Sequence, residues 1–167
     1  TILPQDRSGE FSDIWSFLRP LYVGLHAPGQ RLEVDTSPPA PHFHQDLELG
    51  YIVKGAGTLV YNGRSIPLAL SDLFFLDALV PHATFGNGME EIVVHLRTQW
   101  VINAHLDEGD LRLWRPFVAV RTGLSPVLSG RDDLGMQLRA VLEAYNGGGS
   151  YAGLSAWARL LPVLIEI

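Results

Sequence analysis

The chain has 167 residues, 47% hydrophobic and 18% charged, so it is long and apolar enough to fold around a core of its own. Its formal net charge of -6 argues against a nucleic-acid-binding surface on these residues, because phosphate binding needs an excess of Lys and Arg. Cysteine is absent, which excludes disulfides and thiolate metal sites. No apolar run approaches the ~18 residues that span a bilayer, and no signal peptide is visible, so we expect a cytoplasmic protein without membrane contact.

Short apolar runs separated by turn residues predict strands through most of the first hundred residues, after an irregular or partly helical lead-in over residues 1–20. Asn62-Gly63 is the strongest hairpin signal in the chain. Pro67 has no backbone donor, which limits its strand to a sheet edge or a bulge. Short strands at this density are typical of a barrel or a sandwich. The expected strands are residues 22–26, 31–35, 48–53, 58–61, 65–70, 73–76, 82–85 and 91–96.

After residue 104 the pattern changes from strands to helices. Residues 104–116 read as a loop or a short helix. Further on, Asp132 or Asp133 is a candidate N-cap for a helix with apolar residues at i, i+4, i+7, i+8 and i+11. The three glycines at 147–149 end this helix.

A second helix is expected from Ser150, its candidate N-cap, to the last residue of the chain, with a kink at Pro162. Its apolar residues follow each other at steps of three and four, which is the pattern by which one helix meets another. This seam could pack on the chain's own barrel, but we favour a subunit interface, since exposed apolar surface tends to be covered. Its members are Leu154, Trp157, Leu161 and Leu164.

Four residues carry side chains that can bind a metal or a ligand, at an informative spacing. His42 and His44 lie on the same face of an extended segment, because side chains alternate along a strand. Glu48 has the same parity, but at ~3.3 Å per residue it would lie about 20 Å from His42 unless the chain bends between them. His82 follows Pro81 one or two hairpins later. Imidazole nitrogen and carboxylate oxygen suit zinc, nickel, iron or manganese, and the residue types alone do not choose among these.

Each of these residues also has a simpler interpretation. The two histidines of the first pair could hydrogen-bond an organic effector or water. Glu48 could pair with Arg64 or Arg97, since buried carboxylates usually have a partner, and His82 could be a plain loop-to-strand residue. The remaining histidines have no comparable context, and we interpret them as structural or exposed: His26, His95 and His105.

The run from His42 to Gly55 resembles the first cupin motif, which reads His, one residue, His, three residues, Glu, six residues, Gly. The second cupin motif is only partly present. Ser71-Asp72 stands where Gly-Asp is usual, and the Pro-x-Gly before the last histidine, His82, is lost. The resemblance implies a mainly β fold, a cupin-type double-stranded β-helix (jelly-roll) barrel followed by a C-terminal pair of α-helices.

The longer string from His42 to His82 resembles the N-terminal regulatory domain of AraC-type transcription regulators. The resemblance implies a cupin barrel with its lead-in over residues 1–104 and a linker with a two-helix dimerisation segment over residues 105–167. DNA would be bound only by a C-terminal domain that is absent from this chain. The resemblance also implies a homodimer with a small effector inside the barrel, held by His42, His44, Glu48, Tyr51 and His82. A divalent transition metal (Zn, Ni, Fe or Mn) would be held by His42, His44, Glu48 and His82.

The main alternative function is a metal-dependent cupin enzyme of the dioxygenase or sugar isomerase type. The complete set of three imidazoles and a carboxylate favours it, because these donors leave open positions on a metal ion. The partial second motif and the helical tail count against it, since a minimal catalytic cupin does not need the tail. A third possibility is a stand-alone cupin that binds a partner or a metabolite.

Overall fold

The computed structural model describes residues 21–27, 40–98, 113–120 and 123–167. The lead-in expected over residues 1–20 and the strand expected over residues 31–35 lie outside these ranges. Within them the chain forms eight strands and three helices. The strands are β1 (Leu21–His26), β2 (Asp46–Lys54), β3 (Gly57–Tyr61), β4 (Arg64–Leu68), β5 (Leu73–Leu76), β6 (His82–Phe85), β7 (Glu90–Arg97) and β8 (Val127–Leu128). The helices are α3 (Arg115–Ala119), α4 (Asp132–Asn146) and α5 (Ala152–Glu166).

The strands form two antiparallel sheets, one with the order β1-β7-β2-β5-β8 and one with the order β4-β3-β6. Seven of these strands match expected ones to within a few residues. The eighth, β8, was not expected, because two residues are too few for an alternating pattern to show in the sequence. It pairs with Leu73 and Phe74 of β5 and extends the larger sheet by one strand.

Turn chemistry positions the smaller sheet. Asn62 and Gly63 both have positive φ, 47° and 76°, as a type I′ hairpin requires, and they join β3 to β4 as predicted. Pro67 lies in β4, which pairs with β3 alone in the described sheet, so the predicted edge position is confirmed. Gly55, the last residue of the first cupin motif, has a φ of 73°, a conformation that explains why the motif needs glycine there.

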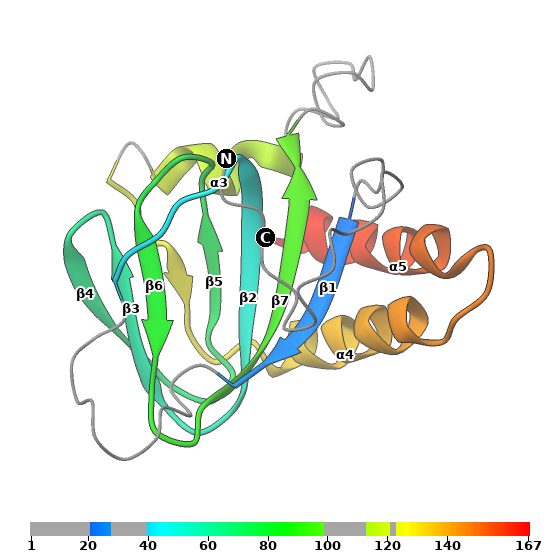
Figure 1. Ribbon diagram of the computed structural model, residues 1–167, viewed down its shortest axis with the longest axis horizontal. Helices are drawn as coiled ribbons and strands as arrows, with labels where there is room; N and C mark the ends of the chain where they lie inside the picture. Colours follow the sequence, from blue (N-terminus) through cyan, green and yellow to red (C-terminus); the bar gives the residue numbers. More distant parts are fainter. Residues whose placement is uncertain (1–20, 28–39, 99–112, 121–122) are drawn as a thin grey trace.

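Helices α4 and α5 lie side by side against one flank of the barrel, next to β1 and β7 (Figure 1). Helix α4 packs against β1, β2 and β7, and α5 packs against α4. The helix-facing layer of the core includes Leu134, Leu138 and Val141 of α4, which are fully buried as their spacing predicts. None of the described helices is long and apolar enough to cross a membrane.

The caps of the two long helices differ from the prediction. The N-cap residue of α4 is Arg131, and Asp132 and Asp133 lie in the first turn, where a negative charge is favourable beside the free backbone N–H groups. Asp132 also accepts a hydrogen bond from the hydroxyl of Ser71, which ties the start of α4 to the loop before β5. The N-cap residue of α5 is Tyr151 and not Ser150.

Candidate metal centre

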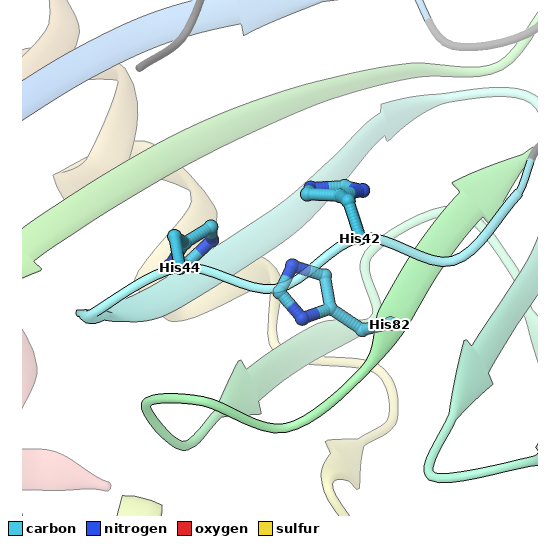
Figure 2. Close-up of side chains that lie close together, drawn as sticks. All are labelled: His42, His44 and His82. Carbon is cyan, nitrogen blue, oxygen red and sulfur yellow. The ribbon is translucent and has the colours of Figure 1, made fainter. Parts of the chain in front are cut away.

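Backbone pairing brings the three histidines of the predicted site together. His42 and His44 lie on the extended segment before β2, and His82 begins β6. The backbones of His42 and His82 exchange two hydrogen bonds, 2.9 and 2.8 Å long. The amide of Leu79 donates to the carbonyl of His44 at 2.8 Å. The three rings therefore lie close together, as Figure 2 shows, with the ring centroids of His42 and His44 4.5 and 4.8 Å from that of His82.

Glu48 lies at the centre of this group, at the start of β2. Its Oε2 atom is 2.9 Å from Nε2 of His44, 3.3 Å from Nε2 of His82 and 4.0 Å from Nε2 of His95. The predicted bend between His44 and Glu48 is present, because Asp46 starts the strand and the segment before it turns away. The carboxylate is thus surrounded by imidazoles drawn from three separate stretches of the chain.

Two backbone carbonyls determine how two of these imidazoles are oriented. Nδ1 of His44 lies 3.0 Å from the carbonyl oxygen of Asp46, and Nδ1 of His82 lies 2.8 Å from that of Val80. A carbonyl oxygen only accepts hydrogen bonds, so both Nδ1 atoms carry a proton and donate it. In the neutral ring, Nε2 then has a lone pair that points at Glu48. Such an outer hydrogen bond is the usual way in which a protein orients a metal-binding histidine.

A lone pair on nitrogen and a carboxylate oxygen repel each other unless a positive charge lies between them. Without a metal a proton takes this place. Burial disfavours the charged form of Glu48, but the hydrogen bond from His44 and the close approach of the His82 imidazole outweigh it and hold its pKa far below the usual range. Burial also opposes protonation of His44, but its contact with Glu48 prevails and raises its pKa. A divalent cation would replace this proton and carry more charge.

His95 differs from His44 in its electrostatics. It is buried beside the centre, and burial lowers its pKa to about 4, with the nearby charge of Glu48 opposing the shift. Its imidazole is therefore neutral at neutral pH. A histidine that binds a metal must be neutral, because a protonated ring nitrogen has no lone pair to give.

The donors of the centre fit a divalent transition metal. Two overlapping groups have their donor atoms within 4.8 Å of one another: His42, His44 and His82 in one, and His44, Glu48 and His95 in the other. Nε2 of His82 is buried and has no hydrogen-bond partner, so the protein itself leaves this lone pair free. Imidazole nitrogens with one carboxylate oxygen suit zinc, nickel, iron or manganese.

The structure thus brings the four residues of the predicted metal site close together and places a further imidazole, His95, beside Glu48. The sequence pattern led us to interpret His95 as structural or exposed. The alternation of β7 shows only that its side chain shares a face with Glu91. Which strand lies beside β7 is decided by the sheet, where His95 is the direct partner of Glu48. No local signal in the sequence indicates that pairing.

Tyr51, expected in the effector site, lies elsewhere. It has the opposite parity to Glu48 on β2, so it leaves the opposite face of the strand. Its ring packs against Gly135 of α4, outside the barrel. Tyr51 is three residues from Glu48, and residues an odd number of positions apart on a regular strand point to opposite faces. The prediction that Tyr51 belongs to the effector site is therefore wrong.

A buried carboxylate that the sequence analysis missed lies on the same face of the larger sheet as Glu48. Glu91 of β7 pairs with Ile52 and accepts a hydrogen bond from the hydroxyl of Thr84 at 2.8 Å, while its other oxygen is buried without a hydrogen-bond partner. Burial raises the pKa of Glu91 to about 7. An isolated Glu in a strand has no signal that separates it from a solvent-facing residue.

The four residues of the predicted dimer seam do not share one free face. Leu154 is 66% exposed, and Trp157 is partly buried with its ring stacked on that of Trp114. Leu161 is partly buried as well, whereas Leu164 is buried within the chain at 2% exposure. Leu164 is therefore a core residue, and only part of the seam is accessible to a second copy.

Comparison with known proteins agrees with this architecture. Residues 30–97 match the family model of the cupin domain. The match covers less than half of the chain, and over these residues the chain is similar to a cupin domain. The predicted fold class, a cupin barrel followed by C-terminal helices, is thereby confirmed. No match was found among curated proteins.

Among solved structures, the chain is similar to an apo form of a ToxT variant from Vibrio cholerae strain SCE256, with 15% sequence identity and a TM-score of 0.58. The match covers 88% of this chain and 55% of that one, so the chain spans about half the length of ToxT. At this identity the likeness concerns the fold alone. Because it covers most of the chain, it includes C-terminal helices as well as the barrel.

Two further matches are weaker. A variant of salicylate 1,2-dioxygenase from Pseudoaminobacter salicylatoxidans is 18% identical, with 55% of this chain and 26% of that chain covered and a TM-score of 0.41. A protein described as a predicted oxalate decarboxylase from Thermotoga maritima is 25% identical, with 46% and 64% covered and a TM-score of 0.36. These scores are too low to support an argument about the function of this chain.

Proposed function

We propose that this cupin chain is the ligand-sensing and dimerisation module of a bacterial AraC-type transcription regulator, with a small effector bound inside the barrel. One observation carries the proposal. Helix α4 of the pair packs directly on β2 and β7, the strands that carry Glu48 and His95. A sensor needs such a connection, because an effector acts only by favouring one arrangement of the molecule over another.

Strand β2 supplies this connection in a single element. Glu48 leaves one face of β2 toward the imidazoles, and Tyr51 leaves the other face toward Gly135 of α4. Both side chains are almost fully buried, at 6% and 4% exposure. A shift of β2 on ligand binding would therefore be transmitted to α4, since close-packed side chains leave little free space to absorb it.

The remaining parts of the proposal concern organisation. We assign residues 1–104 to the barrel with its lead-in and residues 105–167 to a linker and the dimerisation helices. The partners would be a small-molecule effector and a second copy of the chain, in the cytoplasm. DNA would be bound through a C-terminal domain outside these residues, which agrees with the net charge of -6 on the chain itself.

Sequencing the gene beyond codon 167 provides the sharpest test. We expect an open reading frame that continues and encodes two helix-turn-helix motifs with a basic surface. A stop codon shortly after Ile167, or a catalytic domain in that place, would contradict the proposal. A thermal-shift screen of sugars, small acids and aromatic metabolites, with and without added metal, should then identify the effector class by a rise in melting temperature.

The alternative is a metal-dependent cupin enzyme, and the convergence of imidazoles on Glu48 is the observation that favours it. A bound metal would supply Lewis-acid polarisation or oxygen activation. The protein residues would hold and orient the ion, with Asp46 and Val80 carbonyls keeping two imidazoles in position. Steady turnover of a substrate by metal-loaded protein, lost in His44→Gln, would support the enzyme and count against the sensor.

A further inference from the structure

We propose that His95 is a further metal ligand of this centre, beside the four residues whose spacing indicates a metal site. The inference deepens the proposed function, since it rests on metal binding at the histidine centre. It adds the imidazole that faces Glu48 from strand β7, and this ligand would reduce the number of positions on the ion that remain for an effector.

The sheet register places His95 at the centre. Glu48 of β2 and His95 of β7 are direct partners in an antiparallel pair, so their side chains leave the same face next to each other. The His95 ring lies 4.7 Å from the His44 ring, centroid to centroid. The side chain is 20% exposed, so it is largely shielded from competing water.

The distances around Glu48 Oε2 also fit ligands that share one ion. Two ligands at about 2.1 Å from one ion lie roughly 3.0 Å apart at a right angle and about 3.4 Å apart at a tetrahedral angle. The separations from His44 and His82, 2.9 and 3.3 Å, fall close to this range. The 4.0 Å to His95 is too long for a hydrogen bond but within the span of two ligands across one ion.

An aromatic side chain covers the outer side of His95. The ring of Tyr22 on β1 lies 5.6 Å from the His95 ring and 6.2 Å from that of Tyr145 on α4. Tyr22 is the cross-strand partner of His95, so it shields the imidazole from the side away from Glu48. As a ligand, His95 would take a position on the ion that an effector could otherwise occupy.

The test uses the 167-residue protein, freed of metal with a chelator, and nickel chloride as the probe. Nickel affinity is measured by titration calorimetry for wild type, His95→Gln, His44→Gln and His26→Gln. His26 is the matched control, since its imidazole lies on β1 beside Tyr22 but belongs to neither donor group. We expect His95→Gln to weaken nickel binding at least 10-fold, because losing even a residue that only hydrogen-bonds to a metal ligand weakens metal binding by about that much. We expect His26→Gln to leave the nickel affinity within about twofold of wild type.

X-ray absorption at the nickel edge provides a readout that a purely structural role would not change. We expect four imidazoles in the wild type and three in His95→Gln. Circular dichroism of the metal-free proteins confirms that the variants are folded. If His95→Gln does not fold, the imidazole count of the wild type decides by itself, because a count of three would overturn the inference.

Failure of the inference and failure of the metal site are distinguishable. Wild-type affinity in His95→Gln, together with loss in His44→Gln, would overturn the role of His95 and leave the predicted four-residue site intact. An equal loss of nickel affinity in His26→Gln and His95→Gln would also overturn it, since both substitutions would then weaken binding indirectly, by disturbing the strands that hold the site. A wild type that binds no nickel would overturn metal binding and the inference together, whereas the sensor proposal would still be decided by the downstream gene.

Discussion

At the scale of single residues, the centre depends on where protons lie. His44 and His82 each donate Nδ1–H to a backbone carbonyl, which points Nε2 at Glu48. The spacing in the sequence predicted that His42, His44 and His82 lie near Glu48, but it did not predict His95. It does not contain the carbonyl partners at Asp46 and Val80, because these are backbone atoms positioned by local folding.

A glycine substitution tests the contact between helix and barrel. Gly135→Ala should destabilise the protein by about 1–3 kcal/mol, because a Cβ there would overlap the ring of buried Tyr51. This outcome reverses the usual preference of helices for Ala over Gly. Gly153→Ala in α5, where an added Cβ meets nothing within 4 Å, is the control and should stabilise by up to about 1 kcal/mol. Urea unfolding of both variants gives the comparison, and equal effects would contradict the packing.

A second residue-scale prediction concerns pH. The folded-state pKa of Glu91 is about 7 against 4.5 for the free side chain, so between these values the unfolded chain releases a proton that the folded chain keeps. Stability contributed by the protonated carboxyl is therefore lost as pH rises through this window, at a cost of roughly 3 kcal/mol above it.

Glu91→Gln removes this titration. The difference in unfolding free energy, variant minus wild type, should therefore be about 3 kcal/mol larger at pH 8 than at about pH 4. Denaturant unfolding across that range measures the difference. Glu143→Gln, which removes an exposed carboxylate on α4, corrects for the general change in charge. A difference between variant and wild type that does not vary with pH would contradict the burial of Glu91 as the cause.

At the scale of secondary structure, predictability followed the strength of the local pattern. Asn62 and Gly63 both adopt positive φ readily, so the pair favours a tight hairpin turn without help from the rest of the fold. The β3–β4 hairpin was therefore predictable to within a residue or two. The two residues of β8 have no such pattern, and β5 selects them through tertiary pairing. For the same reason the sequence could not show that Leu164 of the α5 seam belongs to the core. Spacing shows that residues lie along a helix, but not whether α4 or a second chain covers them.

The seam gives a prediction at this scale. Leu154→Asp should convert a dimer to a monomer without a loss of stability, because Leu154 is 66% exposed in the single chain. Leu164→Ala should instead cost about 2–5 kcal/mol of unfolding free energy, since Leu164 is buried within the chain. Light scattering and urea unfolding separate the two effects. A wild type that stays monomeric at high concentration would count against an interface on α5.

At the scale of the whole molecule, metal binding and folding are linked. An ion that binds only the folded chain raises the unfolding free energy, by about 2.7 kcal/mol at a free concentration 100 times the dissociation constant. We expect nickel or zinc to raise the melting temperature, a chelator to reverse the rise, and His44→Gln to abolish it. The rise should shrink as pH falls, because protons compete with the ion for the imidazoles. An unchanged melting temperature in the wild type would contradict a metal centre.

The sequence by itself determined the kind of fold and most of the donor set, since strand alternation, turn residues and the spacing of His42, His44 and Glu48 are local properties of the chain. The tertiary structure decided which elements became neighbours. It brought His95 beside Glu48, turned Tyr51 toward α4 and buried Leu164. The physical reason is that sheet register and helix docking depend on the packing of the whole core, and residues far apart in the chain leave no mark of that choice in either segment alone.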